Sequence, residues 1–162
     1  MATTISLFIF YENYFHGILF VYLDLYLLQS LQLNKMATKY LTKQDFIDQV
    51  FDFENQQEWN YKGSLPAIID FYADWCGPCK TVAPTLEQLS EEYENKVSIF
   101  KVDTDKEAEL SHLFGIQSIP TFLFIPVAGA PMVQRGALPK NAFKQVIEER
   151  LLSKTVVEEE KI

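Results

Sequence analysis

The chain contains only two cysteines, and both lie in the hexapeptide Trp75-Cys76-Gly77-Pro78-Cys79-Lys80. Two residues between cysteines at the start of a helix place both thiols on one turn, where they can form a reducible disulfide or share a metal ion. Unpaired backbone N–H groups and the helix dipole favour negative charge at this position. We therefore expect the first cysteine, Cys76, to be a thiolate nucleophile.

A zinc site is the main alternative to redox chemistry at this cysteine pair. Structural zinc takes four protein ligands, and the remaining candidates are the two histidines of the chain, His16 and His112. This ligand supply makes zinc the weaker interpretation, and we predict that no metal is bound. Two inert buried thiols are a third possibility, but they would not require Gly77 and Pro78 between them.

Composition limits the other classes of function. The chain has 162 residues, of which 48% are hydrophobic, so it can form one packed domain with extensions. Its formal charge is -8 and its pI is near 4.7. A surface that binds phosphate groups needs clustered Lys and Arg, and the sequence contains no such cluster. Nucleic acid is therefore excluded as the main partner.

The first 35 residues differ in composition from the rest of the chain. They are rich in Phe, Tyr, Ile and Leu and contain no Lys or Arg before Lys35. A secretory signal peptide needs a positively charged start and a small-residue cleavage site, and neither is clear here. A membrane helix would run from about Phe15 to Leu33, where Asp24 near the centre makes insertion marginal.

The interpretation that we favour is that residues 1–35 are not part of the working protein. Met36-Ala37-Thr38-Lys39 resembles a natural start. The preceding residues would then come from an over-extended start site and be disordered or loosely helical. If they did anchor the chain, the basic residues Lys35, Lys39 and Lys43 on the C-terminal side would place the following domain in the cytoplasm.

Hydrophobic periodicity predicts strands that alternate with helices, followed by a closing hairpin. Thr42 with Asp45 three residues on marks a helix start, and Pro84 is expected to kink its helix. The acidic tail, residues 154–162, is expected to be a solvated end. We expect helices from Thr42, over Lys80–Tyr93, from Asp103 to Gly115 and from Pro139, and strands over Ala67–Tyr72, Val97–Val102, Thr121–Ile125 and Met132–Arg135, with a short edge strand around Trp59 and Tyr61.

Several motifs follow one another in a fixed order between residues 67 and 152. They are Asp70-Phe71-Tyr72-Ala73-Asp74-Trp75-Cys76-Gly77-Pro78-Cys79-Lys80, Pro84, Lys101-Val102-Asp103, Ile119-Pro120-Thr121 and Gly136-Ala137-Leu138. With these motifs the sequence resembles the thioredoxin family. The resemblance implies the thioredoxin fold, an α/β architecture in which a central mixed β-sheet has helices on both faces, formed here by residues 36–153. The implied activity is reduction of protein disulfides by dithiol–disulfide exchange.

The two cysteines are expected to have unequal roles. Cys76, at the exposed helix start, would attack a client disulfide and form a mixed disulfide. Cys79, one turn into the helix and more buried, would then attack Cys76 and release the reduced client. Asp70 lies in an apolar strand, where burial would raise its pKa. The resemblance implies that Asp70 lies beneath the disulfide and assists proton transfer, with Lys101 nearby.

The resemblance also implies a recognition surface around the cysteine pair. Pro120 matches the proline that the family holds in the cis form facing the disulfide, which leaves the Ile119 backbone free to pair with an extended client. A flat apolar surface suits many flexible partners, so we expect broad specificity. The residues expected in this surface are Trp75, Gly77, Pro78, Ile119, Pro120, Gly136 and Ala137.

The partners that the resemblance implies are disulfide-containing client proteins and a flavin-dependent thioredoxin reductase that supplies electrons from NADPH. No cofactor is expected on the chain itself, and we expect a monomer in the cytoplasm. Two alternatives stay open. One is a membrane-tethered thiol–disulfide oxidoreductase of the cytochrome-maturation type, against which the basic residues that follow residue 34 argue. The other is a binding module that uses the same apolar surface independently of its sulfurs.

Overall fold

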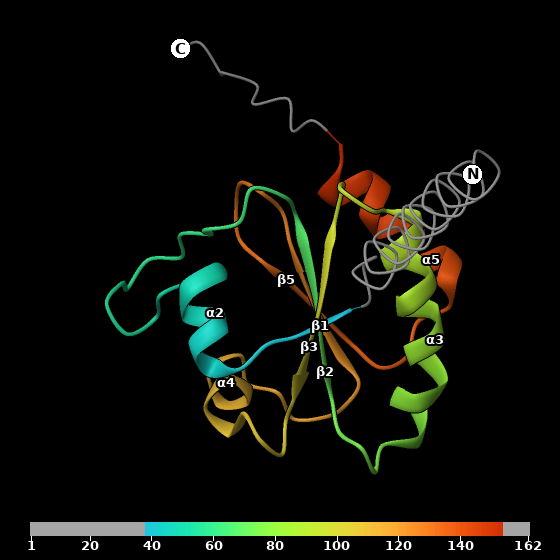
Figure 1. The fold of residues 1–162 in the computed structure, drawn as a ribbon, viewed down its shortest axis with the longest axis horizontal. Coiled ribbons are helices and arrows are strands. Elements are labelled where there is room, and N and C mark those ends of the chain that lie inside the picture. Colours follow the sequence, from blue (N-terminus) through green and yellow to red (C-terminus); the bar gives the residue numbers. More distant parts are fainter. Residues whose placement is uncertain (1–37, 154–162) are drawn as a thin grey trace, which may run out of the picture. The chain divides into compact units, whose positions relative to one another are not determined.

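The computed structural model describes residues 38–153 of the chain. The elements in this range are β1 Lys39–Tyr40, α2 Lys43–Gln49, β2 Ala67–Tyr72, α3 Gly77–Glu92, β3 Ser98–Asp103, α4 Ala108–Leu113, β4 Thr121–Ile125, β5 Met132–Arg135, α5 Lys140–Val146 and the π-helical turn η1 Ile147–Leu151. The strands form one sheet in the order β1-β3-β2-β4-β5 (Figure 1). Strands β1, β3 and β2 pair in parallel and β4 and β5 pair antiparallel, so the sheet is mixed, as predicted.

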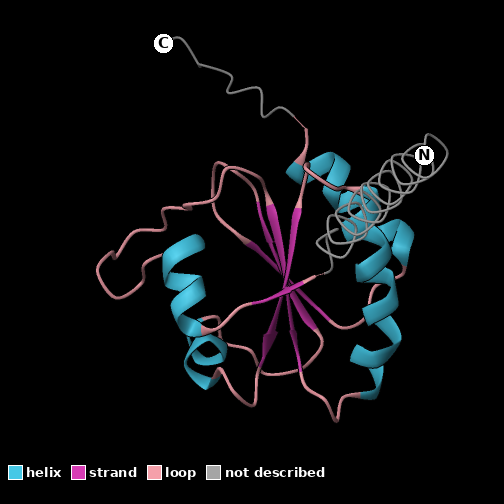
Figure 2. Ribbon diagram, in the orientation of Figure 1, coloured by secondary structure: helices cyan, strands magenta, loops and turns pink. Residues whose placement is uncertain are grey.

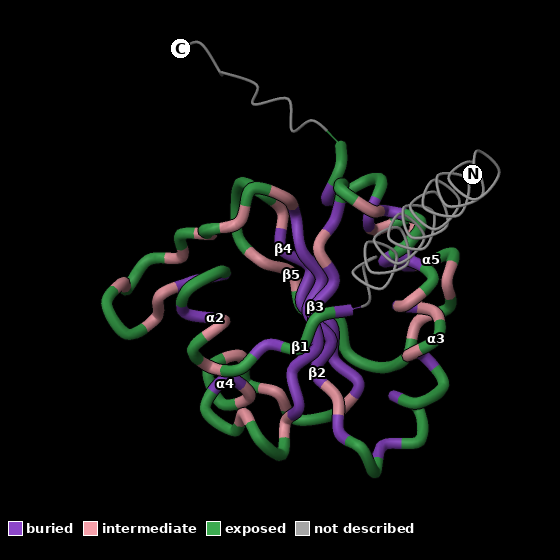
Figure 3. The backbone as a smooth tube through the Cα atoms, viewed as in Figure 1, coloured by how far each residue is buried: buried purple, intermediate pink, exposed green. Residues whose placement is uncertain are grey.

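Helices cover both faces of this sheet (Figure 2). On one face, Phe46 of α2 and Leu110 of α4 belong to one apolar cluster. On the other face, Leu86 of α3 and Phe143 of α5 belong to a second cluster. The three central strands, β2, β3 and β4, are almost entirely buried between these helices (Figure 3). Removal of these side chains from water is the main favourable term in folding, and the two clusters confirm the predicted α/β fold.

Side chains along β2 alternate between the two faces of the sheet. Ile69 and Phe71 belong to the cluster under α2 and α4, and Ile68 belongs to the cluster under α3 and α5. Asp70 has the same parity as Ile68, so it points to the face covered by α3. Lys101 of β3 is the register partner of Asp70 and points to the same face. The alternation thus places a carboxyl group and an ammonium group behind the helix that follows the cysteine motif.

The start of α2 is fixed by its N-cap, as predicted. The Thr42 hydroxyl accepts a hydrogen bond from the Asp45 N–H at 3.2 Å, and the Asp45 carboxylate accepts one from the Thr42 N–H at 3.0 Å. This reciprocal capping box pairs two backbone N–H groups that the helix itself leaves without partners. Behind the cap, Phe46 and Val50 are fully buried.

The edge strand of the sheet is β1, so the prediction of an edge strand around Trp59 and Tyr61 is wrong. Tyr40 of β1 is the register partner of Lys101 in β3. Trp59 instead packs on Phe51, with ring centroids 4.9 Å apart, in the cluster on the α2 face. The aromatic residues of this polar segment therefore anchor a loop to the core and do not pair as a strand.

Helix α4 begins at Ala108, later than the predicted start at Asp103. Asp103 ends β3, and its carboxylate accepts a hydrogen bond from the Asp105 N–H at 3.1 Å and pairs with the Lys106 ammonium at 2.8 Å. These two contacts hold a turn between strand and helix. The predicted end of the helix is confirmed, because α4 stops just before Gly115, whose φ is +57°.

The chain divides into two units, Met1–Lys35 and Met36–Ile162, and only the second contains residues that the structure describes. The predictions for residues 1–35 and 154–162 lie outside the described residues and stay predictions. Among residues 38–153, no helix is both long enough and apolar enough to cross a membrane.

Candidate active site

The two cysteines form a disulfide at the start of α3. Their Sγ atoms are 2.10 Å apart and their Cα atoms 5.3 Å apart. Cys76 is the N-cap of the helix, and its Sγ accepts a hydrogen bond from the Cys79 N–H at 3.2 Å. Pro78 lies in the first turn, where its missing N–H removes no helical hydrogen bond and its fixed φ suits a helix. This explains why α3 begins at Gly77, earlier than the predicted start at Lys80.

Burial does not distinguish the two cysteines in the way the sequence predicts. Cys76 is expected to be exposed and Cys79 more buried, but both are only 4% exposed. The difference between them is electrostatic. Cys76 Sγ lies at the N-terminal end of a helix of 16 residues, where free N–H groups and the helix dipole favour a negative charge. The position of Cys76, rather than its exposure, therefore favours its thiolate.

Asp70 lies buried on the face of the sheet that α3 covers. It is 1% exposed, and its Oδ2 lies 3.6 Å from Lys101 Nζ. Burial raises the pKa of Asp70 from 3.8 to about 6, because desolvation outweighs the attraction of the Lys101 cation. The second carboxyl oxygen, Oδ1, has no hydrogen-bond partner among the residues described. A carboxyl group with this pKa can exchange a proton close to neutral pH.

Lys101 reaches Asp70 from the neighbouring strand. The two residues are register partners across β2 and β3, and Lys101 is only 7% exposed. The Lys101 ammonium also lies over the ring of Tyr72, 4.6 Å from the ring centroid. Lys101 is therefore held between a carboxylate and an aromatic ring.

The turn before β4 supplies the second part of the site. The Ile119–Pro120 peptide bond is cis, as the resemblance implies. The Gly136 N–H donates a hydrogen bond to the Pro120 carbonyl at 2.8 Å, which joins this turn to the residue that follows β5. Gly136 has a φ of +85°, which residues with a Cβ rarely adopt. Within the described part of the chain, the Ile119 backbone takes part in no hydrogen bond.

Strand pairing brings this turn to the cysteine loop. Phe71 of β2 and Thr121 of β4 are register partners in an antiparallel pair. The turn at Pro120 therefore lies at the end of the sheet where β2 ends and the loop to Cys76 begins. The cysteine loop and the Pro120 turn, which are far apart in the sequence, thus lie at the same end of the sheet, as the resemblance implies.

The predicted recognition surface contains both exposed and buried residues. Trp75 is 70% exposed, and its indole N–H donates a hydrogen bond to Asp105 Oδ2 at 2.9 Å. Ile119 is partly buried and Pro120 is buried. The exposed members are Trp75, Gly77, Pro78, Gly136 and Ala137. Asp105 is a contact that sequence reasoning missed, since nothing in the sequence links it to a tryptophan 30 residues away.

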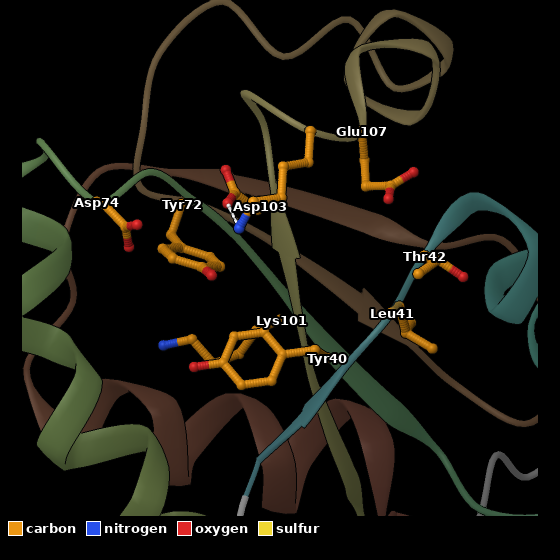
Figure 4. Close-up of a pocket in the computed structure, with 9 residues that line it drawn as sticks. Tyr40, Leu41, Thr42, Tyr72, Asp74, Lys101, Asp103 and Glu107 are labelled. Carbon is orange, nitrogen blue, oxygen red and sulfur yellow. Dashed lines mark ion pairs between the residues drawn. The ribbon is translucent and has the colours of Figure 1, made fainter.

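A pocket of about 410 Å³ lies beside Lys101 (Figure 4). Sequence reasoning also missed this pocket, because Tyr40 belongs to a strand that the sequence did not predict. The residues that line it are Tyr40, Leu41, Thr42, Tyr72, Asp74, Lys101, Asp103, Lys106 and Glu107.

The cysteines are bonded to each other, which leaves neither thiolate free for a metal ion in this state. Across residues 38–153, no group of three or more His, Cys, Asp and Glu side chains could hold a metal ion. His112 is exposed in the last turn of α4.

The described residues combine a disulfide at a helix start, a buried carboxyl group on the sheet face that this helix covers, and a cis-proline turn at the end of the sheet where the cysteine loop begins. This combination suits thiol–disulfide exchange. Comparisons with known proteins agree with this class. The family model for thioredoxin matches residues 37–149. Thioredoxin from Borreliella burgdorferi is 53% identical over 109 residues, which cover 67% of this chain and 93% of that protein. Thioredoxin 1 from a Nostoc species is 37% identical over 87 residues, which cover 54% of this chain and 81% of that protein.

Solved structures give the same result. The crystal structure of chloroplastic thioredoxin z superimposes with a TM-score of 0.60 and 26% sequence identity, over 70% of this chain and 94% of that chain. The chain therefore belongs to the thioredoxin family. It is a protein-disulfide oxidoreductase that acts by dithiol–disulfide exchange. Its relatives include bacterial thioredoxins and a chloroplastic M-type thioredoxin from Spinacia oleracea.

Proposed function

We propose that Cys76 is the attacking thiolate in the reduction of client disulfides, that Cys79 is the resolving thiol and that Asp70 handles the proton. The observation that carries this proposal is the bonded cysteine pair, in which Cys76 Sγ accepts a hydrogen bond at the start of α3. The same N–H group would stabilise the Cys76 thiolate once the disulfide is reduced.

In the reduced protein, the Cys76 thiolate attacks one sulfur of the client disulfide. The client S–S bond breaks, a bond forms between Cys76 and the attacked sulfur, and the other client sulfur leaves as a thiolate that takes up a proton. Cys79 then gives up its proton and attacks Cys76 Sγ, which expels the second client thiolate to be protonated in turn. The client gains two electrons and two protons, and the protein ends as the Cys76–Cys79 disulfide.

Asp70 would accept the Cys79 proton in the second step. Its burial on the α3 face and its raised pKa of about 6 support this role, because the carboxylate form is available at neutral pH and is a stronger base than an ordinary carboxylate. Lys101 would keep this carboxylate partly ionised by its charge.

Client recognition would use the surface around the turn before β4, at the end of the sheet where β2 ends. The free Ile119 backbone would pair with an extended client strand next to the sulfur, and the exposed Trp75 ring would supply apolar contact area. Because hydrogen bonds to the client backbone do not depend on the client's side chains, the protein would accept many clients. Gly77, Pro78, Gly136 and Ala137 would leave the approach to the sulfur uncrowded.

The oxidised protein needs an electron source to act again. We infer that a flavin-dependent thioredoxin reductase supplies electrons from NADPH, that the chain itself binds no cofactor and that it acts as a monomer in the cytoplasm. Membership of the family and the high identity to a bacterial thioredoxin support these assignments. Insulin reduction driven by NADPH and a thioredoxin reductase tests the electron source. Activity with dithiothreitol alone would point to a different reductant.

The roles of the cysteines are tested by Cys79→Ser, with Cys76→Ser as the matched control. We expect Cys79→Ser to trap clients as mixed disulfides that dithiothreitol releases, because no thiol is left to attack Cys76. Cys76→Ser should trap none. Non-reducing gel electrophoresis measures both. Turnover by Cys79→Ser, or equal trapping by the two variants, would overturn the assignment.

The role of Asp70 is tested by Asp70→Asn. We expect the exchange rate near neutral pH to fall about tenfold, below the usual contribution of general bases because water can replace the carboxylate in part. The rate should also lose its dependence on pH near the pKa of Asp70. Asp48→Asn is the control, because Asp48 is exposed on α2, on the opposite face of the sheet. An unchanged pH profile in Asp70→Asn would contradict the proposed role.

A further inference from the structure

Lys101 lies between Asp70 and a pocket that carries other carboxylates. Its charge lowers the pKa of Asp70 only while it stays on the Asp70 side. Its ammonium lies 3.6 Å from the Asp70 carboxylate, and its side chain also lines the 410 Å³ pocket. Lysine has a flexible four-carbon stem and carries its charge at a point, so it can turn toward any carboxylate within reach. The pocket that Lys101 helps to line also carries three other carboxylates, on Asp74, Asp103 and Glu107.

These three carboxylates are not equally available. Asp103 is paired with the Lys106 ammonium at 2.8 Å, and Glu107 accepts a hydrogen bond from the Lys43 N–H at 2.9 Å. Asp74 is exposed and makes no close ion pair with any residue of the described range, although its charge acts on Lys106 from a longer distance. Asp74 is therefore the strongest competitor of Asp70 for the Lys101 charge.

The ring of Tyr72 lies over the Lys101 ammonium in the same pocket as this competitor. Figure 4 shows the ring beside the Asp74 and Asp103 side chains. Tyr72 is the register partner of Asp103 across β2 and β3. This pair lies two residues along the strands from the pair of Asp70 and Lys101, so all four side chains point to the same face of the sheet. The ring centroid is 4.6 Å from Lys101 Nζ, a distance at which the ring face attracts a cation.

Tyr72 contacts the Lys101 ammonium through its ring, and its hydroxyl carries no negative charge that would compete with Asp70 for the ammonium. Burial, helped by Tyr40 and by the carboxylates of Asp103, Asp74 and Asp70, raises the pKa of the Tyr72 hydroxyl to about 12. The hydroxyl therefore stays neutral at every pH at which disulfide exchange is measured.

We propose that Tyr72 is a positioning residue for disulfide exchange, whose ring holds the Lys101 ammonium against Asp70 and away from the Asp74 carboxylate. The inference rests on the proton-handling role proposed for Asp70. Tyr72 acts through Lys101 rather than on the reacting sulfurs. Without the ring, Lys101 turns to Asp74, Asp70 loses its counter-charge, and the carboxyl group holds its proton more tightly.

Few other groups can affect Asp70. Its register partner on β4 is the uncharged Phe122, and the disulfide-bonded cysteines at the start of α3 do not titrate. The charge that acts on its carboxyl group is that of Lys101. The titratable and charged groups that surround Lys101 in turn are Asp70, Tyr72, Tyr40, Asp74, Asp103, Lys106 and Glu107.

The test is the titration of the Asp70 carboxyl group, followed by carbon NMR in the oxidised full-length protein. Tyr72→Leu should raise the titration midpoint by about one pH unit, the lower end of what an opposite charge at this distance contributes. Tyr72→Phe keeps the ring and should leave the midpoint unchanged. Tyr40→Leu removes a ring from the same pocket, but not the ring over the ammonium, and should also leave it unchanged.

Two double variants test whether the effect passes through Lys101. In a Lys101→Met background, Tyr72→Leu should produce no further shift, because there is no ammonium left to position. Asp74→Asn combined with Tyr72→Leu should return the midpoint toward its original value. An equal shift in Tyr72→Phe, or a shift that persists in the Lys101→Met background, overturns the proposal. If Tyr72→Leu does not fold, Tyr72→Met takes its place, since its unbranched side chain fills irregular space.

The exchange rate then separates this proposal from the role of Asp70. The inflection in the pH profile of the Tyr72→Leu rate should move upward by the same amount as the NMR midpoint. A moved midpoint with an unmoved rate profile overturns the link to exchange. If Asp70→Asn shows that Asp70 has no role in the rate, the NMR midpoints still decide whether the ring holds Lys101.

Discussion

At Asp70, burial and ion pairing act in opposite directions, and burial has the larger effect. The Lys101 charge favours the carboxylate, while the loss of water around a residue that is 1% exposed favours the neutral acid. The net result is a pKa of about 6 in place of 3.8. The native protein therefore binds a proton at Asp70 more tightly than the unfolded chain does.

This difference predicts how stability depends on pH. Between about pH 4 and pH 6 the native state holds a proton that the unfolded state has lost, so the free energy of unfolding falls as the pH rises through this window. The Asp70 contribution is fully present below about pH 4 and is lost above about pH 6 to 7. From the two pKa values, the loss amounts to about 3 kcal/mol.

Urea unfolding of the oxidised protein and of Asp70→Asn, from about pH 4 to about pH 8, measures this term. The free energy of unfolding of the native sequence should fall by about 2 to 2.5 kcal/mol relative to that of Asp70→Asn over this range, because the unfolded carboxyl group is still partly protonated at pH 4. Asp48→Asn on α2 should keep the wild-type dependence. A difference that does not change with pH, or that changes in the opposite direction, would contradict the raised proton affinity of Asp70.

The sequence predicted individual site residues where a short local motif identifies them. The hexapeptide predicted that Cys76 and Cys79 could form a reducible disulfide, and the structure shows them bonded. An acid within an apolar strand predicted the buried Asp70. The equal burial of the two cysteines was not predictable, because it depends on side chains that pack from other parts of the chain. The bond between Trp75 and Asp105 was missed for the same reason.

Among the elements, the turn before β4 and the end of β5 act as one unit. The hydrogen bond from Gly136 to Pro120 ties them together. No atom lies within 4 Å of the position that a Cβ on Gly136 would occupy, so space does not require glycine here. Its φ of +85° does. The backbone conformation is therefore the reason for a glycine at this position.

We expect Gly136→Ala to lower the free energy of unfolding by about 1 to 2 kcal/mol, the usual cost of this conformation for a residue with a Cβ. Gly77→Ala is the matched control. Gly77 also has no neighbouring atom within 4 Å of an added Cβ, but it has a helical conformation in the first turn of α3. This change should leave stability unchanged or raise it by up to about 1 kcal/mol. Urea denaturation compares the two, and equal effects would show that conformation is not the cause.

The elements that the sequence predicted correctly are those marked by a continuous apolar run, a preceding turn or a helix cap. The strands at β2, β4 and β5 and the helix start at Thr42 are confirmed. Strand β1 has two residues, Lys39 and Tyr40, which is too short for any alternation to be visible. The late start of α4 depends on the ion pair of Asp103 with Lys106, which the sequence does not distinguish from a helix cap.

At the scale of the whole molecule, the members of both apolar clusters within the described part of the chain lie between Leu41 and Leu151. The family model matches almost the same range, residues 37–149. The core, the disulfide and the cis-proline turn all lie within it. We therefore expect this range to fold and to react without the first 35 residues.

A chain that begins at Met36 should unfold at the same urea concentration as the full-length chain and reduce insulin at the same rate. The full-length protein, measured in parallel, is the control. A loss of more than about 1 kcal/mol in the free energy of unfolding would show that residues 1–35 contribute contacts to the domain. A lower rate at equal stability would show that they take part in client binding.

The two edge strands of the sheet determine whether the protein can pair with exposed strands of the proteins that a disulfide reductase meets. Its clients expose unpaired strands when their disulfides are strained or incomplete, and a long open sheet edge would pair with them and aggregate. In the described part of the chain, one edge is β1, two residues long and carrying Lys39, and the other is β5, four residues long and preceded by Pro131. Both features discourage strand addition. If clients pair with the Ile119 backbone, as proposed, neither sheet edge then competes with that turn for an extended client strand.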